Sequence, residues 1–458
     1  MRSLLRETDD PVTAEEIAWG FRKLLEQEAL ARPLVVVFDD LHWAEETLLD
    51  LVEHVADLSR DAPILLLCMA RPELLERRPS WGGGKWNAST VLLEPLDAAE
   101  TKQLLSELGD VTPGLQERIV EVAEGNPLFV EEMLALVRDS SRDEVEVPPT
   151  IQALLAARLD QLDPAERSVL ERGSVEGRTF HRGAVSALAD DGGSGVDQRL
   201  VALVRKELVR PDRALLAGDD AYRFRHLLIR DAAYDALPKR TRAEPHARFA
   251  DWLDEHGEAL VERDEIVGYH LEQAARYQAE LGQPDPVLVE RAAARLGAGG
   301  RRANGRGDYR AAHALLSRAA DLLRPVRLDL ALELEVAWGM DAFDARAGAA
   351  AADDLAGRAE RAGDRSGALL ARAMALVHRS GAGDVLPDNE SEELCRRALP
   401  AEEVHGDARR LGLLWELMAV AAPSIGCGMT LRSRRRAAPS PISGSTAAGR
   451  RVRSSTGR

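Results

Sequence analysis

A short apolar run that ends in two acids constrains the fold more than any other feature of this sequence. Residues 34–38 read LVVVF, Asp39 and Asp40 follow at once, and a helix-like segment comes next. A continuous apolar run of this length is typical of a parallel strand that is buried on both faces. Parallel strands deliver the residues after them to the carboxyl edge of a sheet, where nucleotide sites form in open α/β folds. We therefore expect a buried strand that presents two carboxylates at such an edge.

Strands and helices alternate around this run. A second continuous apolar run covers residues 64–69, and residues 91–93 predict a third, short strand. Asp97-x-x-Glu100 is a capping box that marks the start of a further helix. Strands that alternate with helices predict a parallel sheet covered by helices. We assign this partial sheet, which lacks its expected first strand, to a domain of residues 1–140.

Residues 148–240 combine helical segments with a turn at Gly218-Asp219-Asp220 between two apolar stretches. Helices followed by a hairpin predict a winged helix. Such a domain could contact DNA, or it could be an internal lid on a nucleotide site. The net charge of −17 favours the lid and argues against direct nucleic-acid binding, because an acidic protein repels the phosphate backbone.

Residues 245–425 have an almost entirely helical pattern. The segment Gly305-x-Gly307-Asp308-Tyr309, followed by apolar residues at helical spacing, resembles one tetratricopeptide-type helix pair. Alanine-rich pairs follow it without a sharp period. We therefore predict an all-α, tetratricopeptide-like helical array and leave its repeat class open.

The composition changes abruptly near the end of the chain. Residues 431–458 hold eight arginines, no acid and no apolar periodicity, which predicts a disordered basic tail. The tail could bind nucleic acid or an acidic surface, or it could be a non-native end such as a shifted reading frame. The abruptness of the change favours the second interpretation.

The cysteines and the hydropathy pattern indicate in which cellular compartment the protein lies. The three cysteines lie far apart and form no ligand spacing, and no apolar run is long enough to span a bilayer. The N-terminus has no signal-peptide core. We expect a cytoplasmic protein without a membrane partner.

Six segments of this chain form an ordered series: VVVFDDLHWAEE, LLLCMARPELL, LEPLDAAE, EGNPLFVEEML, VPPTIQALLAARLDQL and YRFRHLLIRDAAYDAL. The series resembles one family, the AAA-like signal-transduction ATPases with numerous domains, which carry similar segments in the same order. These ATPases occur in LuxR-type transcriptional activators and behind adenylate cyclase domains. The resemblance covers about residues 10–330 and implies a P-loop NTPase-like α/β sheet, then a winged helix, then a helical sensor array.

Two departures from the family pattern stand out. The phosphate-loop pattern G-x-x-x-x-G-K-S/T should precede the acidic strand, yet the only glycine before Asp39 is Gly20. No LuxR-type helix-turn-helix closes the C-terminus. We expect an N-terminally truncated fragment of a larger regulator, in which ATP or ADP and Mg²⁺ binding is weak or lost and hydrolysis is deficient.

The resemblance implies roles for the two acids and for one arginine. The run 34–38 would be a Walker B strand, in which Asp39 holds Mg²⁺ through water and Asp40 orients or deprotonates the attacking water. Arg71 follows the second strand, where such folds place a sensor of the terminal phosphate. The structural alternatives are helix capping for the acids and an ordinary surface arginine for Arg71.

Three further residues match nucleotide-binding positions of the family. Gly125 and Pro127 match a G-x-P element that packs on the adenine side, and the alternative is a simple helix break. His226 lies where the winged helix can offer a histidine to the β-phosphate of ADP. A lone histidine is more often structural, and that interpretation is the stronger one here.

Three functions are compatible with these features. The first is an ATP/ADP-dependent switch coupled to a helical sensor array. The second is a protein-interaction scaffold, in which the array binds protein partners and the ATPase domain is vestigial. The third is the regulatory half of a multidomain adenylate cyclase. In the first and third, an effector domain, either DNA-binding or cyclase, lies outside this chain.

Overall fold

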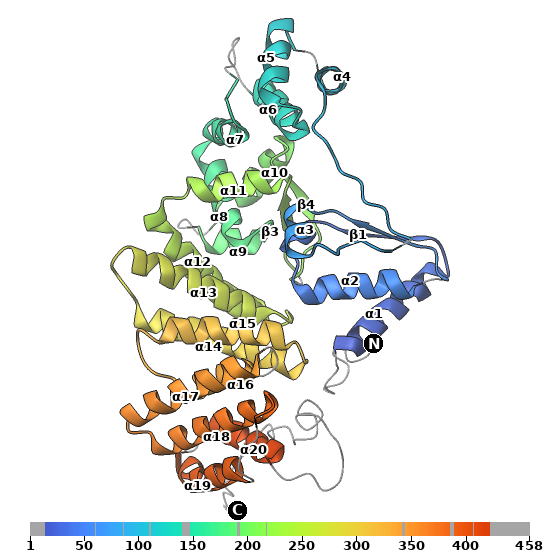
Figure 1. Cartoon of the computed structure of the whole chain (residues 1–458). Coiled ribbons are helices and arrows are strands. Elements are labelled where there is room, and N and C mark those ends of the chain that lie inside the picture. Colours follow the sequence, from blue (N-terminus) through green and yellow to red (C-terminus); the bar gives the residue numbers. More distant parts are fainter. Residues whose placement is uncertain are drawn as a thin grey trace, which may run out of the picture. The chain divides into compact units, whose positions relative to one another are not determined.

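The computed structural model shows a chain built mainly of helices (Figure 1). It divides between Leu315 and Leu316 into two compact units, here called the first and the second unit. None of the described helices combines the length and the apolar character that crossing a bilayer requires. The structure describes residues 14–59, 61–85, 87–109, 111–139, 147–189, 193–216, 218–340, 344–384, 389–405 and 407–421. The predicted basic tail, 431–458, lies outside these residues.

The first unit begins with a small parallel sheet. Strands β1 (Leu34–Phe38) and β2 (Ile64–Cys68) pair in parallel, with Leu34 opposite Ile64 and Phe38 opposite Cys68. Helix α1 packs on both strands and on α2. The two strands and their parallel pairing confirm this part of the sequence prediction. The helices beside them are α1 (Ala14–Ala29), the short 3-10 turn η1 (Leu41–Trp43), α2 (Glu46–Leu58) and α3 (Glu73–Arg77).

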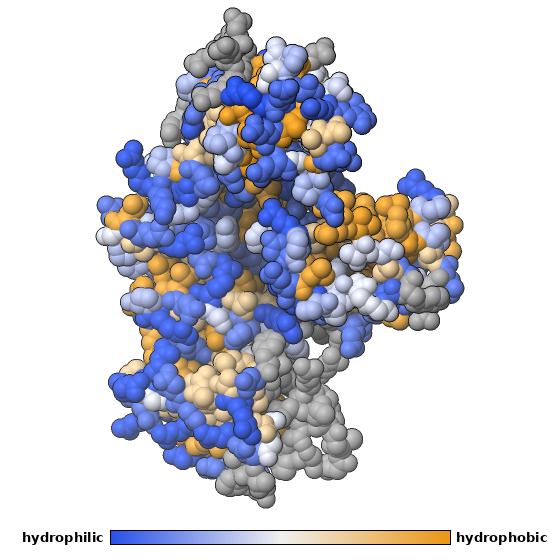
Figure 2. Space-filling model, turned by 45° about the horizontal axis from the view of Figure 1, so that its top comes forward, coloured by the Kyte–Doolittle hydropathy of each residue, from blue (hydrophilic) through white to orange (hydrophobic). Residues whose placement is uncertain are grey.

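One face of this sheet is open to solvent. Val35 and Val37 are 58% and 53% exposed, and Leu65 and Leu67 beside them are exposed as well. Figure 2 shows hydrophobic residues gathered on the arm that carries the two strands. The prediction that β1 is buried on both faces is therefore wrong. Helices α2 and α3 pack on Phe38 and Cys68, which belong to the other face of the sheet.

The predicted third strand at residues 91–93 is absent. Val91, Leu92 and Leu93 lie in an irregular, exposed segment. Three apolar residues carry too little information to select a neighbouring strand and a register, so the local pattern could not decide this segment.

A helical group follows the sheet. Asp97 and Glu100 form the predicted capping box at the start of α4: the Asp97 carboxylate accepts the amides of Ala99 and Glu100, and the Glu100 carboxylate accepts the amide of Asp97. Leu105, Ile119 and Met133 are fully buried in the core of this group. Its helices are α4 (Ala98–Leu108), α5 (Pro113–Ala123), α6 (Pro127–Asp139) and α7 (Ile151–Asp160).

A three-stranded antiparallel sheet comes next, in the order β3-β5-β4. Phe180 of β3 and Phe224 of β5 form its buried centre, with ring centroids 5.1 Å apart. The hairpin expected across Gly218 is β4 and β5, although its first strand ends at Asp212 rather than near Leu215. The elements are α8 (Pro164–Glu176), β3 (Thr179–His181), α9 (Arg182–Ala187), α10 (Val196–Arg205), β4 (Val209–Asp212), β5 (Ala221–Phe224) and α11 (Leu227–Ala236). The winged-helix assignment stays a prediction.

Packed helices complete the first unit. Helix α13 packs against both α12 and α14. Between α11, α12 and α13 lies a buried polar chain: His246 Nδ1 is 2.8 Å from His270 Nδ1, and its Nε2 is 2.8 Å from the Tyr234 hydroxyl, which is 2.9 Å from the Tyr277 hydroxyl. Burial, with nearby arginine charges, lowers the pKa of His246 to about 3. The helices are α12 (Lys239–His256), α13 (Arg263–Glu280) and α14 (Pro286–Gly305), and α15 (Tyr309–Leu323) carries the division between the units.

The second unit is a helical array, which agrees with the helical pattern of the sequence. Helices adjacent in sequence pack on one another, and small residues such as Ala352, Ala356 and Ala371 are buried between them. Gly367 allows the closest approach, because a Cβ there would lie 2.1 Å from the side chain of Leu330. The helices are α16 (Leu330–Met340), α17 (Ala345–Arg361), α18 (Arg365–Gly381), α19 (Glu390–His405) and α20 (Ala408–Ala421).

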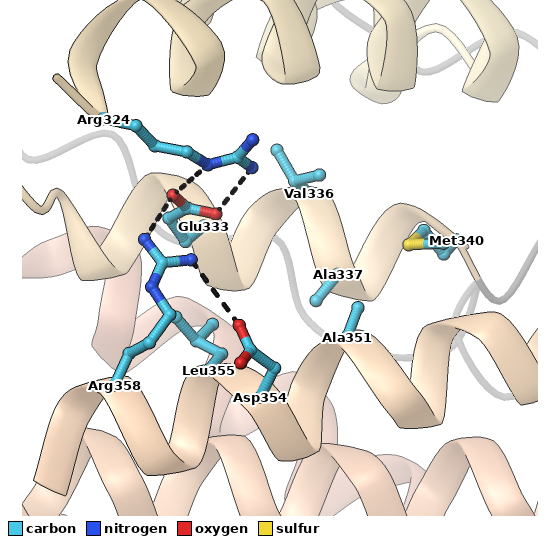
Figure 3. A pocket seen from close by; sticks show the side chains of 9 residues that line it. All are labelled: Arg324, Glu333, Val336, Ala337, Met340, Ala351, Asp354, Leu355 and Arg358. Carbon is cyan, nitrogen blue, oxygen red and sulfur yellow. Dashed lines mark hydrogen bonds and ion pairs between the residues drawn. The ribbon is translucent and has the colours of Figure 1, made fainter.

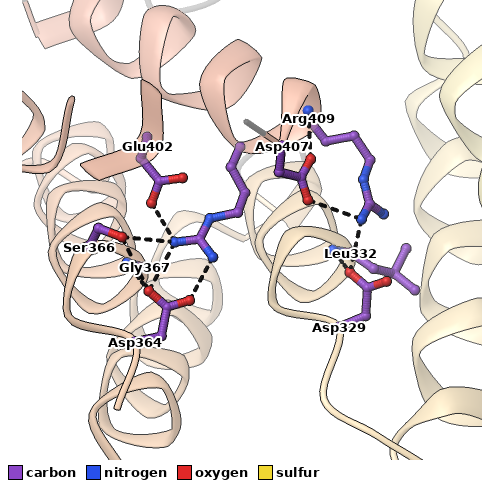
Figure 4. Close-up of polar contacts among 9 residues, drawn as sticks. Asp329, Leu332, Asp364, Ser366, Gly367, Glu402, Asp407 and Arg409 are labelled. Carbon is purple, nitrogen blue, oxygen red and sulfur yellow. Dashed lines mark hydrogen bonds and ion pairs between the residues drawn. The ribbon is translucent and has the colours of Figure 1, made fainter. Parts of the chain in front are cut away.

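A buried arginine joins three helices of this array, and Figure 4 labels two of its partners, Asp364 and Glu402. Arg410 of α20 donates to both carboxylate oxygens of Asp364, at 2.6 and 3.0 Å, and to the carboxylate of Glu402 in α19. Asp364 also caps α18 by accepting the amide of Gly367 at 2.8 Å. Glu402 is fully buried, so its charge depends on Arg410 for compensation.

We predict that Arg410→Leu destabilises the second unit by about 3–5 kcal/mol, because it leaves the carboxylate of Glu402 buried without its partner. The double variant Arg410→Leu/Glu402→Leu should recover much of this loss, since apolar residues can replace a buried ion pair. Hydrogen exchange of the α18 and α20 amides measures both. Equal protection in the wild type and in Arg410→Leu would contradict the prediction.

The histidine chain predicts a dependence of stability on pH. The folded-state pKa of His246, about 3, lies below the ordinary value of 6.5, so between these values the unfolded chain binds a proton that the folded chain does not. Stability of the first unit should therefore fall as the pH drops from about 6.5, by up to about 1.4 kcal/mol per pH unit for this group. In His246→Gln, the stability of the first unit should change less steeply with pH. Hydrogen exchange of the α12 and α13 amides at several pH values measures this slope. An unchanged slope between pH 6 and 5 would count against the assignment.

Candidate functional site

The two acids stand at the carboxyl end of β1, where the sequence places them. The loops after the two strands are hydrogen-bonded together, because Met69 N donates to Phe38 O at 2.8 Å and Leu41 N donates to Met69 O at 3.0 Å. Asp40 adopts the left-handed conformation, with φ 56° and ψ 35°. Aspartate tolerates this conformation better than most residues, and it turns the chain sharply into η1. The backbone thus fixes both carboxylates at the sheet edge.

One arginine holds both carboxylates. Arg178 Nη2 donates to Asp39 Oδ2 at 3.0 Å, and its Nη1 donates to Asp40 Oδ2 at 2.9 Å. The three side chains are 37%, 45% and 36% exposed, respectively, so the pair of contacts is partly open to solvent. Arg178 comes from the residue before β3, about 140 positions away in sequence. The sequence reasoning missed Arg178, because an arginine after a helix-ending glycine carries no distinctive pattern.

Arg178 and His226 are linked through the backbone of β5. Arg178 O accepts the amide of Phe224 at 3.0 Å, and His226 follows two residues later, as the residue before α11. His226 Nε2 lies 3.7 Å from Glu131 Oε2 of α6. Burial lowers the pKa of His226, and the nearby Glu132 and Glu131 only partly oppose this. His226 is therefore near the strand that carries Arg178, but its side chain faces α6.

The remaining predicted residues do not join the acids. Arg71 lies just beyond β2 and is exposed, and among the described residues no ion pair connects it to Asp39 or Asp40. Gly125 has φ +74°, and its carbonyl accepts the amide of Leu96 at 2.9 Å. A Cβ at Gly125 would lie 2.2 Å from Leu96 O, so close packing explains this glycine.

Pro127 begins α6, one turn before Glu131. Helix α6 packs mainly on α4, α5 and α7. Helix α6 thus carries both Pro127 and Glu131, and Glu131 is the neighbour of His226. Asp39 and Asp40 instead contact Arg178, the residue before β3.

A buried histidine sits beside the acids. His42, in η1, is 8% exposed, and within the described part of the chain neither ring nitrogen has a hydrogen-bond partner. Its carbonyl accepts the Arg77 guanidinium at 2.8 Å. Unpaired buried polar atoms are uncommon, and they mark positions where a water or a ligand can satisfy them.

The acids fit a magnesium ion in kind. Mg²⁺ takes oxygen ligands and is commonly held by one or two carboxylates, with water and substrate phosphates completing the shell. No cluster of three or more metal-ligating side chains exists among the described residues, so Asp39 and Asp40 are a partial ligand set. Arg178 binds an oxygen of each carboxylate, and a cation there would compete with it.

Comparisons with known proteins assign no family. No protein-family model matches the chain. An uncharacterized protein of Rhizobium meliloti (strain 1021) is 29% identical over 294 residues, which cover 58% of this chain and 28% of that protein. The chain therefore matches little more than a quarter of a much longer relative. That relative carries no stated activity.

Proposed function

We propose that this chain is the switch and sensor part of a bacterial regulatory ATPase, in which ATP or ADP controls the contact between the acids of β1 and Arg178. The observation that carries this proposal is the paired contact of Asp39 and Asp40 with one guanidinium from the antiparallel sheet. Paired acids at a parallel strand end are the ligand type of a nucleotide site, and Arg178 neutralises them while no cation does.

Four residues would have separate roles in binding the cation and the nucleotide. Asp39 would hold Mg²⁺, which supplies positive charge to the nucleotide phosphates when bound. Asp40, in the left-handed turn after β1, would orient a water molecule. Arg71, exposed beyond β2, would meet the terminal phosphate. Arg178 would be displaced from the acids as the cation binds.

A second group of residues would face the nucleotide from the other side. Gly125 and Pro127 precede and begin α6 and would lie on the adenine side. His226 would approach the β-phosphate of ADP, and its contact with Glu131 at 3.7 Å is long enough to exchange for another partner. A change of partner from Glu131 to the phosphate would move His226 and thereby couple nucleotide binding to the winged-helix region. This region would in turn act on an effector domain for DNA binding or cyclase activity.

Hydrolysis by this chain is expected to be negligible. The sequence holds no phosphate-loop pattern, so the backbone amides and the lysine that stabilise charge on the phosphates are absent from it. Electrostatic stabilisation of this kind is usually the largest catalytic contribution. A phosphate-binding segment from another part of a longer polypeptide would have to supply it.

A second function, protein interaction, is favoured by the open face of the small sheet. Val35, Val37, Leu65 and Leu67 form an exposed apolar surface on β1 and β2, which suits contact with another polypeptide. In that case the helical array and this face would bind protein partners, and nucleotide would have no effect on either.

We predict weak, Mg²⁺-dependent binding of a fluorescent ATP analogue by the full chain. Asp39→Asn or Asp40→Asn should weaken it about ten- to a hundredfold, because each removes a charged ligand contact worth about 1.5–3 kcal/mol. Asp61→Asn is the matched control, since this exposed acid lies before β2, at the opposite end of the sheet. Fluorescence titration with and without Mg²⁺ measures the three affinities.

Two results would contradict the switch. One is nucleotide binding that responds equally to all three substitutions, or no binding at all, which would support the interaction function. The other is Mg²⁺-dependent ATP turnover of about 0.1 per second or more, lost in Asp40→Asn, since activity approaching that of ordinary enzymes requires the missing cradle.

A further inference from the structure

Helix α20, drawn in red in Figure 1, is apolar both on the face that packs on the second unit and on the opposite face. Its inner face packs on α16, α18 and α19, with Leu414 and Leu417 fully buried. On the outer face Trp415 is 51% exposed, and Ala408 and Ala419 are exposed as well. A helix that is hydrophobic all round is ordinarily enclosed by protein, so the outer face lacks the polar character of a solvent-facing helix.

The outer face has the residue spacing of a coiled-coil seam. Four small or aromatic residues follow one another at intervals of four, three and four positions: Ala408, Gly412, Trp415 and Ala419. These are the intervals of the a and d positions of a heptad. Gly412 leaves a gap next to the indole of Trp415, because a Cβ at Gly412 would meet nothing within 4 Å. The intervals read the same in both directions, so the face is complementary to a second copy of itself that runs the opposite way.

We propose that two copies of this chain pair through α20, as antiparallel helices related by a twofold axis at the middle of the outer face. In this register Gly412 of each copy receives the indole of Trp415 of the other, and Ala408 lies opposite Ala419. The small residues let the two backbones approach closely. This pairing is independent of the nucleotide function proposed above.

The residues that flank the seam are complementary in the same register. Arg409 and Glu416 occupy the e positions of the heptad, and Leu411 and Met418 occupy the g positions. In antiparallel helices e lies beside e and g beside g, so Arg409 of each copy comes next to Glu416 of the other. Leu411 likewise comes next to Met418. A parallel pair would set e beside g, and each charge would then face an apolar residue, so charge complementarity selects the antiparallel arrangement.

The two charged residues can reach a second copy while they keep their present contacts. Arg409 Nη2 lies 3.3 Å from Asp329 and 3.3 Å from Asp407, and its side chain is 35% exposed (Figure 4). Glu416 accepts Trp338 Nε1 at 2.8 Å through Oε2, and Oε1 is the oxygen that would accept Arg409 of the second copy. Both side chains are thus held near the border of the outer face.

The array joins its own helices by the same combination of contacts. Small side chains such as Ala352 and Ala356 are buried between its helices. Arginines pair with carboxylates of a neighbouring helix beside them, and Figure 3 shows this at a cavity between α16 and α17, where Arg358 donates to Glu333 at 2.9 Å. A seam of small residues flanked by arginine–carboxylate pairs therefore suffices to pack helices of this unit on one another.

The size of the contact predicts a weak dimer. Helix α20 has 14 residues and is therefore about 21 Å long. One such helix from each copy gives an interface smaller than the roughly 800 Å² per partner of a standard protein complex. We expect a dimer that forms and dissociates in the micromolar range.

Sedimentation velocity of the full chain between about 1 and 100 μM tests the pairing. The wild type should shift from monomer towards dimer over this range. Gly412→Leu fills the gap that receives Trp415 and should keep the chain monomeric throughout. Trp415→Ala should weaken the dimer by more than about tenfold, because central aromatic residues carry much of the energy of an interface.

Gly357→Leu is the matched control, because it makes the same change on α17, where the added Cβ would meet the end of the Arg361 side chain at 3.5 Å. It should pair as the wild type does, and the helical circular dichroism signal should be equal in all variants. Orientation is tested by disulfide cross-linking above the wild-type background. Ala408→Cys mixed with Ala419→Cys should cross-link, and Ala408→Cys alone should not.

Three results would overturn the proposal. The first is a wild type that stays monomeric at about 100 μM. The second is a Gly412→Leu variant that dimerises as the wild type does, which would place the contact on another surface. The third is cross-linking of Ala408→Cys with itself, which requires parallel helices.

Discussion

Two adjacent carboxylates at the end of a strand repel each other, and in the first unit the guanidinium of a single arginine, just before β3, relieves this repulsion. Arg178 contacts Asp39 at 3.0 Å and Asp40 at 2.9 Å, and its backbone is bonded to β5. The small parallel sheet is thereby tied to the antiparallel sheet through charge rather than through a broad apolar contact. Because the three side chains are partly exposed, each of these ion pairs contributes only about 0–1 kcal/mol to the free energy of folding. A contact of this strength can be broken by a competing cation, which is what a switch requires.

Other arginines in the chain have a different physical role. Arg410 is buried and compensates the fully buried Glu402, so its loss would leave a charge in an apolar surrounding. Arg324 and Arg358 are intermediate, since they share the buried Glu333 but keep part of their surface at a cavity. Burial thus separates an arginine that is enclosed between helices from arginines whose guanidinium groups stay partly exposed to solvent.

The sequence predicted the elements that local patterns determine. The apolar runs at 34–38 and 64–69 became β1 and β2, and Asp97 with Glu100 formed the capping box, because hydrophobic period and capping act over a few residues. It failed where partners are remote. Residues 91–93 found no strand to pair with, one face of β1 stayed open, and Arg178 reached the acids from a distant part of the chain. Gly125 was predicted as a nucleotide residue, yet its close approach to Leu96 O offers a packing reason that only the structure reveals.

The central claim is that Arg178 and a divalent cation compete for Asp39 and Asp40. Mn²⁺, which favours oxygen ligands as Mg²⁺ does, can be followed by electron paramagnetic resonance of the free ion. Replacing Arg178 with Gln should tighten Mn²⁺ binding by up to about fivefold, as expected for release from an ion pair worth up to roughly 1 kcal/mol. Arg182→Gln removes a charge from the same region, where Arg182 pairs with Asp197 at 3.4 Å, and should leave the affinity unchanged. Equal affinities in the wild type and in Arg178→Gln, or equal gains in both variants, would contradict the competition.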